Sequence, residues 1–146
     1  MPATAPQHDT TLFAYMVKSH QYLDDLYGEL LDALAANAPD LGDVWAKFEH
    51  TLLSHMEAEE RYVLPSFAKV DPVEALALIR DHGTFREQLL ELGVAVDLHA
   101  IRYERSRELV DRLRAHGARE DNLLYRWADE HLEIALATAA LAHASR

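Results

Sequence analysis

Two His-x-x-x-Glu pairs are the residues of this sequence that best suit a metal site. His55 with Glu59, and His116 with Glu120, are 61 residues apart. Four residues of an α-helix turn through about 400°, so the two side chains of each pair project from one face, about 6 Å apart along the axis. Both members of a pair can therefore reach the same metal site.

A single histidine precedes each pair at a nearly constant distance. His20 lies 35 residues before the first pair, and His82 lies 34 residues before the second. The arrangement of a histidine followed by a His-x-x-x-Glu pair thus occurs twice, which indicates an internal repeat of two helices. The predicted metal ligands are four imidazoles and two carboxylates, namely His20, His55, Glu59, His82, His116 and Glu120.

All six candidate ligands interrupt apolar stripes of helical period, so we expect them to face a core. The stripe of the last pair, for example, reads Leu109, Leu113, His116, Glu120 and Leu123. Buried carboxylates are strongly destabilising unless a partner or a metal ion neutralises them. Arg86, one turn after His82, is the alternative to a metal, because in a metal-free core it would pair with one of the glutamates.

The chemistry of the ligands narrows the choice of metal. The sequence has no cysteine, so the donors must be imidazole or carboxylate, which suit iron, zinc, manganese or copper. Six donors exceed what one tetrahedral zinc ion needs, and two ions fit better. Glu59 and Glu120 would bridge the ions beside an oxo or hydroxo group, leaving one open position on each. Glu60 and Asp121, which follow these glutamates, are candidates to orient ligating histidines.

Glycine and proline divide the chain into the helices that would position these ligands. Apolar residues at intervals of three and four predict helices over residues 10–36, 43–67, 72–95 and 100–127, with a shorter fifth helix over 129–144. Asp71, Pro72 and Glu74 have the pattern of a helix N-terminus. Short connections favour an all-α, antiparallel up-down-up-down four-helix bundle in residues 10–146, after a tail of residues 1–9.

The overall composition is typical of one helical domain and argues against several classes of function. The chain has 146 residues, of which 49% are hydrophobic, with only five glycines and five prolines. A net charge of −11 argues against nucleic acid or an anionic membrane as partner. The sequence has no signal-peptide pattern and no run of eighteen apolar residues, so we expect a cytoplasmic protein, as a monomer or a weak homodimer.

The same motifs resemble the hemerythrin-like, or HHE cation-binding, domain family over nearly the whole chain. Residues 55–65, HMEAEERYVLP, are similar to the family's His-x-x-x-Glu-Glu…Pro signature, and residues 116–121, HGARED, provide the second copy. The resemblance implies a four-helix bundle around a di-iron centre. It assigns His20 and His55 to one iron, His82 and His116 to the other, and Glu59 and Glu120 as bridges.

The sequence departs from the oxygen-carrying hemerythrins at two positions. Those proteins have a further histidine one turn after the residue that matches His82, and an aspartate in place of Glu120; this chain has Arg86 and glutamate there. The missing histidine would expose a coordination position on that iron, unless Asp24 or Tyr62 fills it. This departure argues against reversible oxygen transport.

Three functions of different classes agree with these observations. The first is redox chemistry at a di-iron centre that binds or converts O2, peroxide or nitric oxide, including catalase-like, peroxidase-like or NO-reactive turnover. The second is binding without turnover, in a sensor of oxygen or iron or in a carrier. The third is a metal-holding bundle, in which the ions only stabilise the fold. The sequence indicates no catalytic side chain apart from the ligands and no cofactor besides the metal ions.

Overall fold

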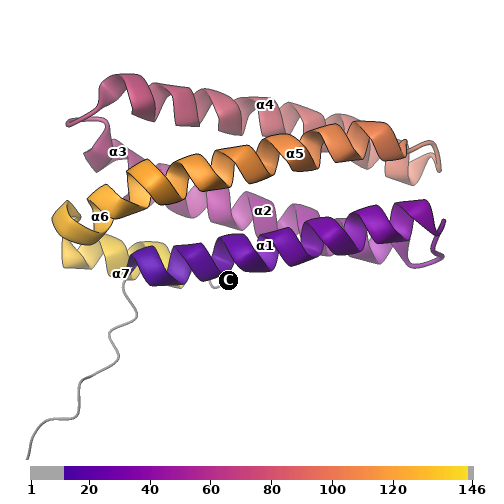
Figure 1. Ribbon diagram of the computed structural model, residues 1–146, viewed down its shortest axis with the longest axis horizontal. Coiled ribbons are helices and arrows are strands. Elements are labelled where there is room, and N and C mark those ends of the chain that lie inside the picture. Colours follow the sequence, from indigo (N-terminus) through magenta and orange to yellow (C-terminus); the bar gives the residue numbers. More distant parts are fainter. Residues whose placement is uncertain (1–11, 145–146) are drawn as a thin grey trace, which may run out of the picture.

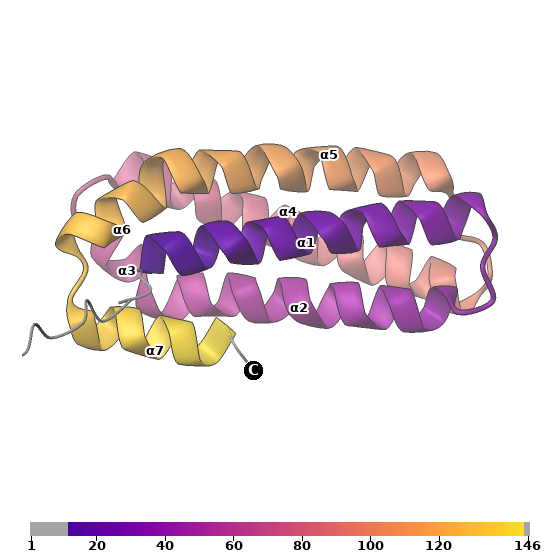
Figure 2. The same ribbon diagram turned by 60° about the horizontal axis from the view of Figure 1, so that its bottom comes forward.

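The computed structural model describes residues 12–144, which form helices and contain no strand. Four long helices lie side by side along the length of the molecule (Figures 1 and 2). They are α1 (Leu12–Ala35), α2 (Leu41–Tyr62), α4 (Pro72–Asp97) and α5 (Tyr103–Arg119). Both α1 and α4 pack against α2 and α5, so the four helices enclose one core. The predicted all-α class is confirmed.

Four shorter elements complete the described chain. They are α3 (Leu64–Phe67), the π-helical turn η1 (Glu120–Leu124), α6 (Tyr125–His131) and α7 (Ile134–Ala144). The chain continues from α5 through η1 into α6, and α7 then folds back beside α2 (Figure 2). Among the described helices, none combines the length and the apolar character needed to cross a membrane.

The observed helix ends follow local backbone chemistry. The predicted helix over 43–67 is divided, with α2 ending at Tyr62 and α3 beginning at Leu64, because Pro65 has no N–H with which to continue the helix. The predicted start of α4 is confirmed, since the Asp71 carboxylate accepts a hydrogen bond of 3.1 Å from the Glu74 backbone N–H. The predicted start of the first helix, at residue 10, lies outside the described residues.

The predicted break near residue 128 is in the wrong place. The helix continues to His131, and the chain becomes extended at Leu132. No glycine or proline marks this position in the sequence. The break allows α7 to lie against α1 and α2, where Ala140 is buried and His143 Nε2 lies 3.1 Å from Glu57 Oε2.

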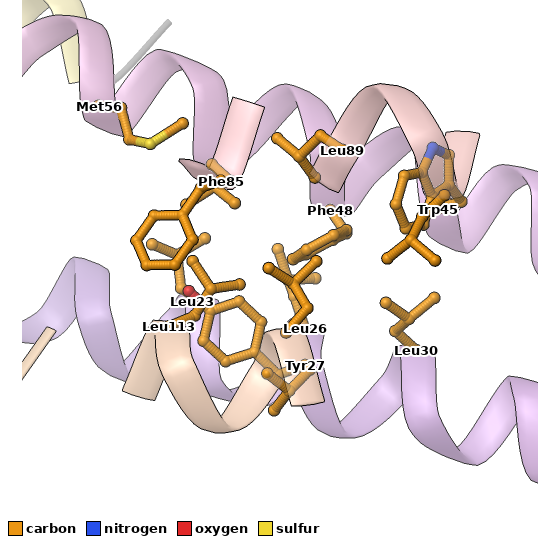
Figure 3. Packing of buried hydrophobic residues seen from close by; sticks show 14 of the residues in the cluster. Leu23, Leu26, Tyr27, Leu30, Trp45, Phe48, Met56, Phe85, Leu89 and Leu113 are labelled. Atoms are coloured by element: carbon orange, nitrogen blue, oxygen red, sulfur yellow. The ribbon is translucent and has the colours of Figure 1, made fainter. Parts of the chain in front are cut away.

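Two clusters of buried apolar residues fill the bundle, and the candidate ligands lie between them. Figure 3 shows the larger cluster, in which α1, α2, α4 and α5 all contribute side chains. On α1, for example, Met16 belongs to the smaller cluster and Leu23 to the larger, with His20 between them. On α4, Leu78 and Phe85 flank His82 in the same way. The candidate ligands are thus enclosed between two apolar layers.

Candidate metal centre

The four candidate histidines form two close pairs in the middle of the bundle. His20 Nε2 lies 2.9 Å from His55 Nε2, and His82 Nε2 lies 3.1 Å from His116 Nε2. These are the pairs that the resemblance to the family implied. The His20 side chain is the most accessible of the four, at 12% exposed, whereas that of His82 is fully buried.

Glu120 spans the two histidine pairs. Its Oε1 lies 3.3 Å from His20 Nε2, and its Oε2 lies 3.1 Å from His116 Nε2. One carboxylate therefore offers an oxygen to each pair, which is the geometry that a bridging ligand requires. The ligand atoms fall into two overlapping groups that share Glu120, in each of which all atoms lie within 4.8 Å of one another.

Glu59 also approaches both histidine pairs. Its Oε1 is 3.3 Å from His55 Nε2 and 3.7 Å from His82 Nε2. Its Oε2 accepts a hydrogen bond of 2.6 Å from the Tyr125 hydroxyl. The structure thus brings together all six residues that the sequence singled out.

Two carboxylates orient histidines from outside the centre, as the sequence predicted. His20 Nδ1 lies 2.7 Å from Asp121 Oδ1, and His82 Nδ1 lies 2.9 Å from Glu60 Oε2. Each of these contacts joins one repeat to the other. Such partners fix the orientation of an imidazole ring and the nitrogen that carries its proton.

The other two histidines have outer partners that sequence reasoning missed. His55 Nδ1 lies 3.0 Å from Ser19 Oγ, and His116 Nδ1 lies 2.8 Å from Asp81 Oδ2. Ser19 and Asp81 directly precede the first histidine of each repeat. The sequence signal that could have identified Ser19 and Asp81 as partners is that they occupy equivalent positions in the two repeats.

This arrangement of donors fits metal ions. Neutral imidazoles that donate Nδ1–H outward present the lone pair of Nε2 inward. Two such lone pairs facing each other at 2.9 or 3.1 Å repel unless a proton or a metal ion lies between them. In addition, Glu59 Oε1 and Glu120 Oε2 are buried and form no hydrogen bond with the described residues. Metal coordination would satisfy all of these atoms.

The two carboxyl groups differ in acidity in the metal-free protein. Burial raises the pKa of Glu59 well above its ordinary value, and the nearby charge of Glu120 adds to this effect. Burial also acts to raise the pKa of Glu120, but hydrogen bonding with Glu59 and the charge of His116 outweigh it and hold this pKa well below its usual range. The buried pair therefore retains one proton when no metal is present.

Three of the candidate histidines also have shifted pKa values. Burial disfavours the charged form of His20, yet hydrogen bonds with Asp121 and Glu120 raise its pKa to about 9. Burial acts on His82 in the same way, and hydrogen bonds with Glu120 and Glu60 again raise the pKa to about 9. Burial lowers the pKa of His55 to about 3. At neutral pH the metal-free centre thus holds protons that metal ions would replace.

The π-helical turn η1 explains why Tyr125 enters the centre. The Tyr125 N–H bonds to the Glu120 carbonyl, five residues earlier, so the turn is one residue wider than in an α-helix. Leu124 and Tyr125 are fully buried as a result, whereas Leu123, which the sequence placed in the core, is 48% exposed. That prediction was wrong because it assumed a regular helical period.

The sequence left three residues as possible partners or ligands of the centre, and the structure shows all three in contacts with other residues. Arg86 pairs with Glu60, at 2.7 and 2.5 Å, and so does not neutralise the buried glutamates. Asp24 pairs with Arg114 on the surface at 2.5 Å. Tyr62 packs in the smaller apolar cluster, with its ring 5.8 Å from that of His143. None of the three completes the centre in this arrangement.

Two surface pockets approach the centre from opposite sides of α5. One, of about 340 Å³, lies between α1 and α5 and is lined in part by His20 and Asp121. The other, of about 370 Å³, lies between α4 and α5 and is lined in part by His116 and Asp81. A small molecule entering either pocket would meet one histidine of one pair.

Comparison with known proteins adds a match to a family. The family model described as the hemerythrin HHE cation binding domain matches residues 11–128, a range that contains all six candidate ligands. Searches of curated proteins and of solved structures gave no significant match. The matched range includes η1 and most of α6 but ends before α7 begins.

Proposed function

The chain belongs to the hemerythrin HHE cation-binding domain family, and we propose that its buried His/Glu cluster holds two iron ions in a carboxylate-bridged centre that binds or reacts with O2, peroxide or nitric oxide. The observation that carries this proposal is the pairing of the four Nε2 atoms, with Glu120 spanning both pairs. Bound iron would supply the redox chemistry for such small ligands.

Each protein group has a definite part in this proposal. His20 and His55 would hold one ion, and His82 and His116 the other. Glu59 and Glu120 would bridge the two ions. The outer partners, Ser19, Glu60, Asp81 and Asp121, would keep every Nδ1–H directed away from the metals, so that each ring is ready to bind before a metal ion arrives.

The position of Arg86 favours a reactive centre over a purely structural one. The guanidinium is held by Glu60, and it has no lone pair with which to coordinate the ion beside His82. That ion would therefore keep a coordination position for a small ligand. Phe85 packs edge-on against His116, with ring centroids 5.2 Å apart, and would keep this side of the centre apolar.

We also propose that the helices form the antiparallel up-down-up-down bundle typical of such centres. The packing of α1 and α4 against both α2 and α5 supports this arrangement. So do the short connections, which alternate between the two ends of the molecule in Figure 1. In such a bundle every long helix directs its ligand to the same level.

The test is metal analysis combined with a visible spectrum of protein purified without added metal. We expect about two iron ions per chain and absorption typical of a bridged ferric pair. Adding peroxide to one sample of the reduced, iron-loaded protein and O2 to another then separates the candidate functions. Gas release or repeated oxidation supports turnover, and a stable oxygenated band that reverses under argon indicates a carrier. A spectrum that does not change with peroxide, O2 or nitric oxide would leave only the structural role.

A further inference from the structure

The helix α4 carries a second apolar face, opposite the one that holds His82. The core-facing side of α4 includes the buried residues Leu78, Phe85 and Leu89. The opposite, exposed side of α4 also carries large apolar residues, together with charged and small residues such as Arg80, Gly83 and Glu87. The exposed large apolar residues of α4 and its C-cap are Val73 79%, Leu76 47%, Ile79 44%, Leu90 74%, Val94 58% and Leu98 70%. These are six of the eleven exposed large apolar residues among the described part of the chain.

Four of these six residues lie on one line along α4, Val73 and Leu76 towards one end and Leu90 and Val94 towards the other, with Arg80, Gly83 and Glu87 between them. Positions 73, 76, 80, 83, 87, 90 and 94 follow the alternating spacing of three and four that keeps side chains on one face of a helix. The stripe is about 32 Å long at 1.5 Å per residue. In Figure 1 α4 runs along the outer edge of the bundle, and its neighbours α2 and α5 lie on its inner side. A stripe of this length and period is the pattern with which one helix packs against another.

The residues of the stripe are arranged nearly symmetrically about its centre, which lies between Gly83 and Thr84. Arg80 and Glu87 lie at equal distances on either side of that point, and so do Val73 and Val94. We propose that this stripe is a homodimer interface, in which α4 of a second copy of the chain packs antiparallel on it across a two-fold axis. A two-fold axis requires one surface to complement itself, and the pairs Val73 with Val94 and Arg80 with Glu87 meet this requirement.

The charged residues of the stripe fit this arrangement. Antiparallel packing about the midpoint brings Arg80 of one protomer opposite Glu87 of the partner subunit, and the symmetry makes this pair twice. Within residues 12–144 neither side chain forms an ion pair of its own. A parallel pairing would instead bring like charges together, so the charge pattern selects the antiparallel orientation.

Gly83 provides a further argument for a helix crossing at this point. Glycine in a helix interior costs about 1 kcal/mol relative to alanine. A Cβ added at Gly83 would meet nothing within 4 Å, so nothing within the described chain requires a residue without a side chain. At the crossing point of two helices, however, glycine allows the backbones to approach closely. A membrane surface as occupant is disfavoured by the chain's net charge of −11.

The test measures self-association of the metal-loaded full-length chain by sedimentation equilibrium over a range of concentrations. A single pair of helices covers an area near the roughly 1,000 Å² at which specific interfaces begin, so we expect a reversible dimer at high micromolar concentration. Leu90→Lys should raise the dissociation constant at least about tenfold. Ile134→Lys is the matched control, because it places the same charge at another exposed apolar residue, 85% exposed against 74% for Leu90, outside the stripe. It should leave the dissociation constant unchanged.

A charge exchange tests the orientation of the dimer. Arg80→Glu alone should weaken the dimer, because it places a second carboxylate opposite Glu87 of the partner subunit. The double variant Arg80→Glu with Glu87→Arg should restore the wild-type constant. A chain that stays monomeric at every concentration, or equal weakening by Leu90→Lys and Ile134→Lys, would overturn the interface. Failure of the double variant to restore the dimer would overturn the antiparallel arrangement. None of these results depends on which metal the centre holds.

Discussion

At the scale of single residues, the candidate centre presents four inward Nε2 atoms and two buried carboxylate oxygens that a metal ion could bind. Each histidine directs its Nδ1–H to an outer group, and each buried glutamate keeps one oxygen without a hydrogen bond to the described residues. Removing a ligand should therefore affect metal content more than it affects the packing of the helices.

Metal content in ligand variants provides the first test. We expect His55→Ala to retain at most about one iron ion per chain, because it removes a donor from one pair, and Glu120→Ala to retain fewer, because it removes a donor shared by both pairs. Iron per chain is measured by elemental analysis after gel filtration. His50→Ala is the control, since His50 lies on the same helix but is exposed. Wild-type stoichiometry in both ligand variants would refute the assignment.

A second prediction concerns the hydrogen bond from Tyr125 to Glu59. In Tyr125→Phe a fully buried carboxylate oxygen loses its 2.6 Å partner, which should lower the free energy of unfolding of the metal-free protein by about 1–3 kcal/mol. The visible spectrum of the loaded protein should shift as well, because the hydroxyl contacts a bridging ligand. Tyr22→Phe, at a residue 45% exposed, should change the unfolding free energy by less than about 0.5 kcal/mol. Equal effects of the two variants would contradict this role.

At the scale of helices, two departures from regular α-helix direct side chains into the core that a regular helix would direct elsewhere. The π-helical turn η1 carries Tyr125 to the centre, and the division between α2 and α3 at Val63 lets Leu64 enter the smaller cluster. Both irregularities follow closely after a candidate bridging glutamate, at similar places in the two repeats. The irregular ends of the helices therefore add Tyr125 to the centre and Leu64 to the apolar layer beside it.

The start of α4 allows a prediction about helix stability. Asp71→Ala removes the acceptor for the Glu74 backbone N–H and should lower the free energy of unfolding by about 1 kcal/mol, measured by urea denaturation. Asp71→Asn keeps an acceptor oxygen at the same place and should lower the free energy of unfolding much less. If the two variants were equally destabilised, the charge of Asp71 near the helix N-terminus, rather than its hydrogen bond, would be responsible.

At the scale of the whole molecule, metal ions would connect all four long helices at one level. Removing them with a chelator should lower the melting temperature, because ions that bind only the folded state add to its stability. The effect is about 4 kcal/mol when the free metal concentration is roughly 1,000-fold above the dissociation constant. Calorimetry of the loaded and stripped protein measures it, and readdition of iron should reverse it. Identical melting temperatures would show that the ions do not connect the helices.

The pH dependence of metal binding follows from the protonated state of the metal-free centre. The pKa values of His20 and His82 are raised to about 9, so at pH 7 both rings carry a proton that the metal must displace. Metal affinity should therefore rise as the pH increases from about 6 to about 9 and level off above it. Titration calorimetry in two buffers of different ionisation enthalpy would detect the released protons. An affinity that stays constant over this range would contradict the prediction.

The sequence by itself determined the helical class and the residues that meet in the core. Helical period placed the six candidate ligands on the core-facing sides of their helices, because residues three or four apart on a helix share a face, and the internal repeat indicated that they meet at one level. The same period misplaced Leu123, which is 48% exposed. The six side chains that the sequence predicted to meet, from four segments of the chain, lie together in the structure. The expected hydrogen bonds of Glu60 and Asp121 to histidines were also predictable, since each follows a candidate bridging residue in its repeat.

Only the tertiary structure decided which groups complete that core. The contacts of Ser19 with His55 and of Asp81 with His116 join different helices, and they depend on how each helix is rotated about its axis. The position of Tyr125 in the centre depends on the wider π-helical turn, and no glycine or proline in the sequence marks that turn. Arg86 was a plausible partner for the buried glutamates by spacing, yet Glu60 on the neighbouring helix holds it outside the centre. These features arise from packing between helices, and helical period carries no information about it.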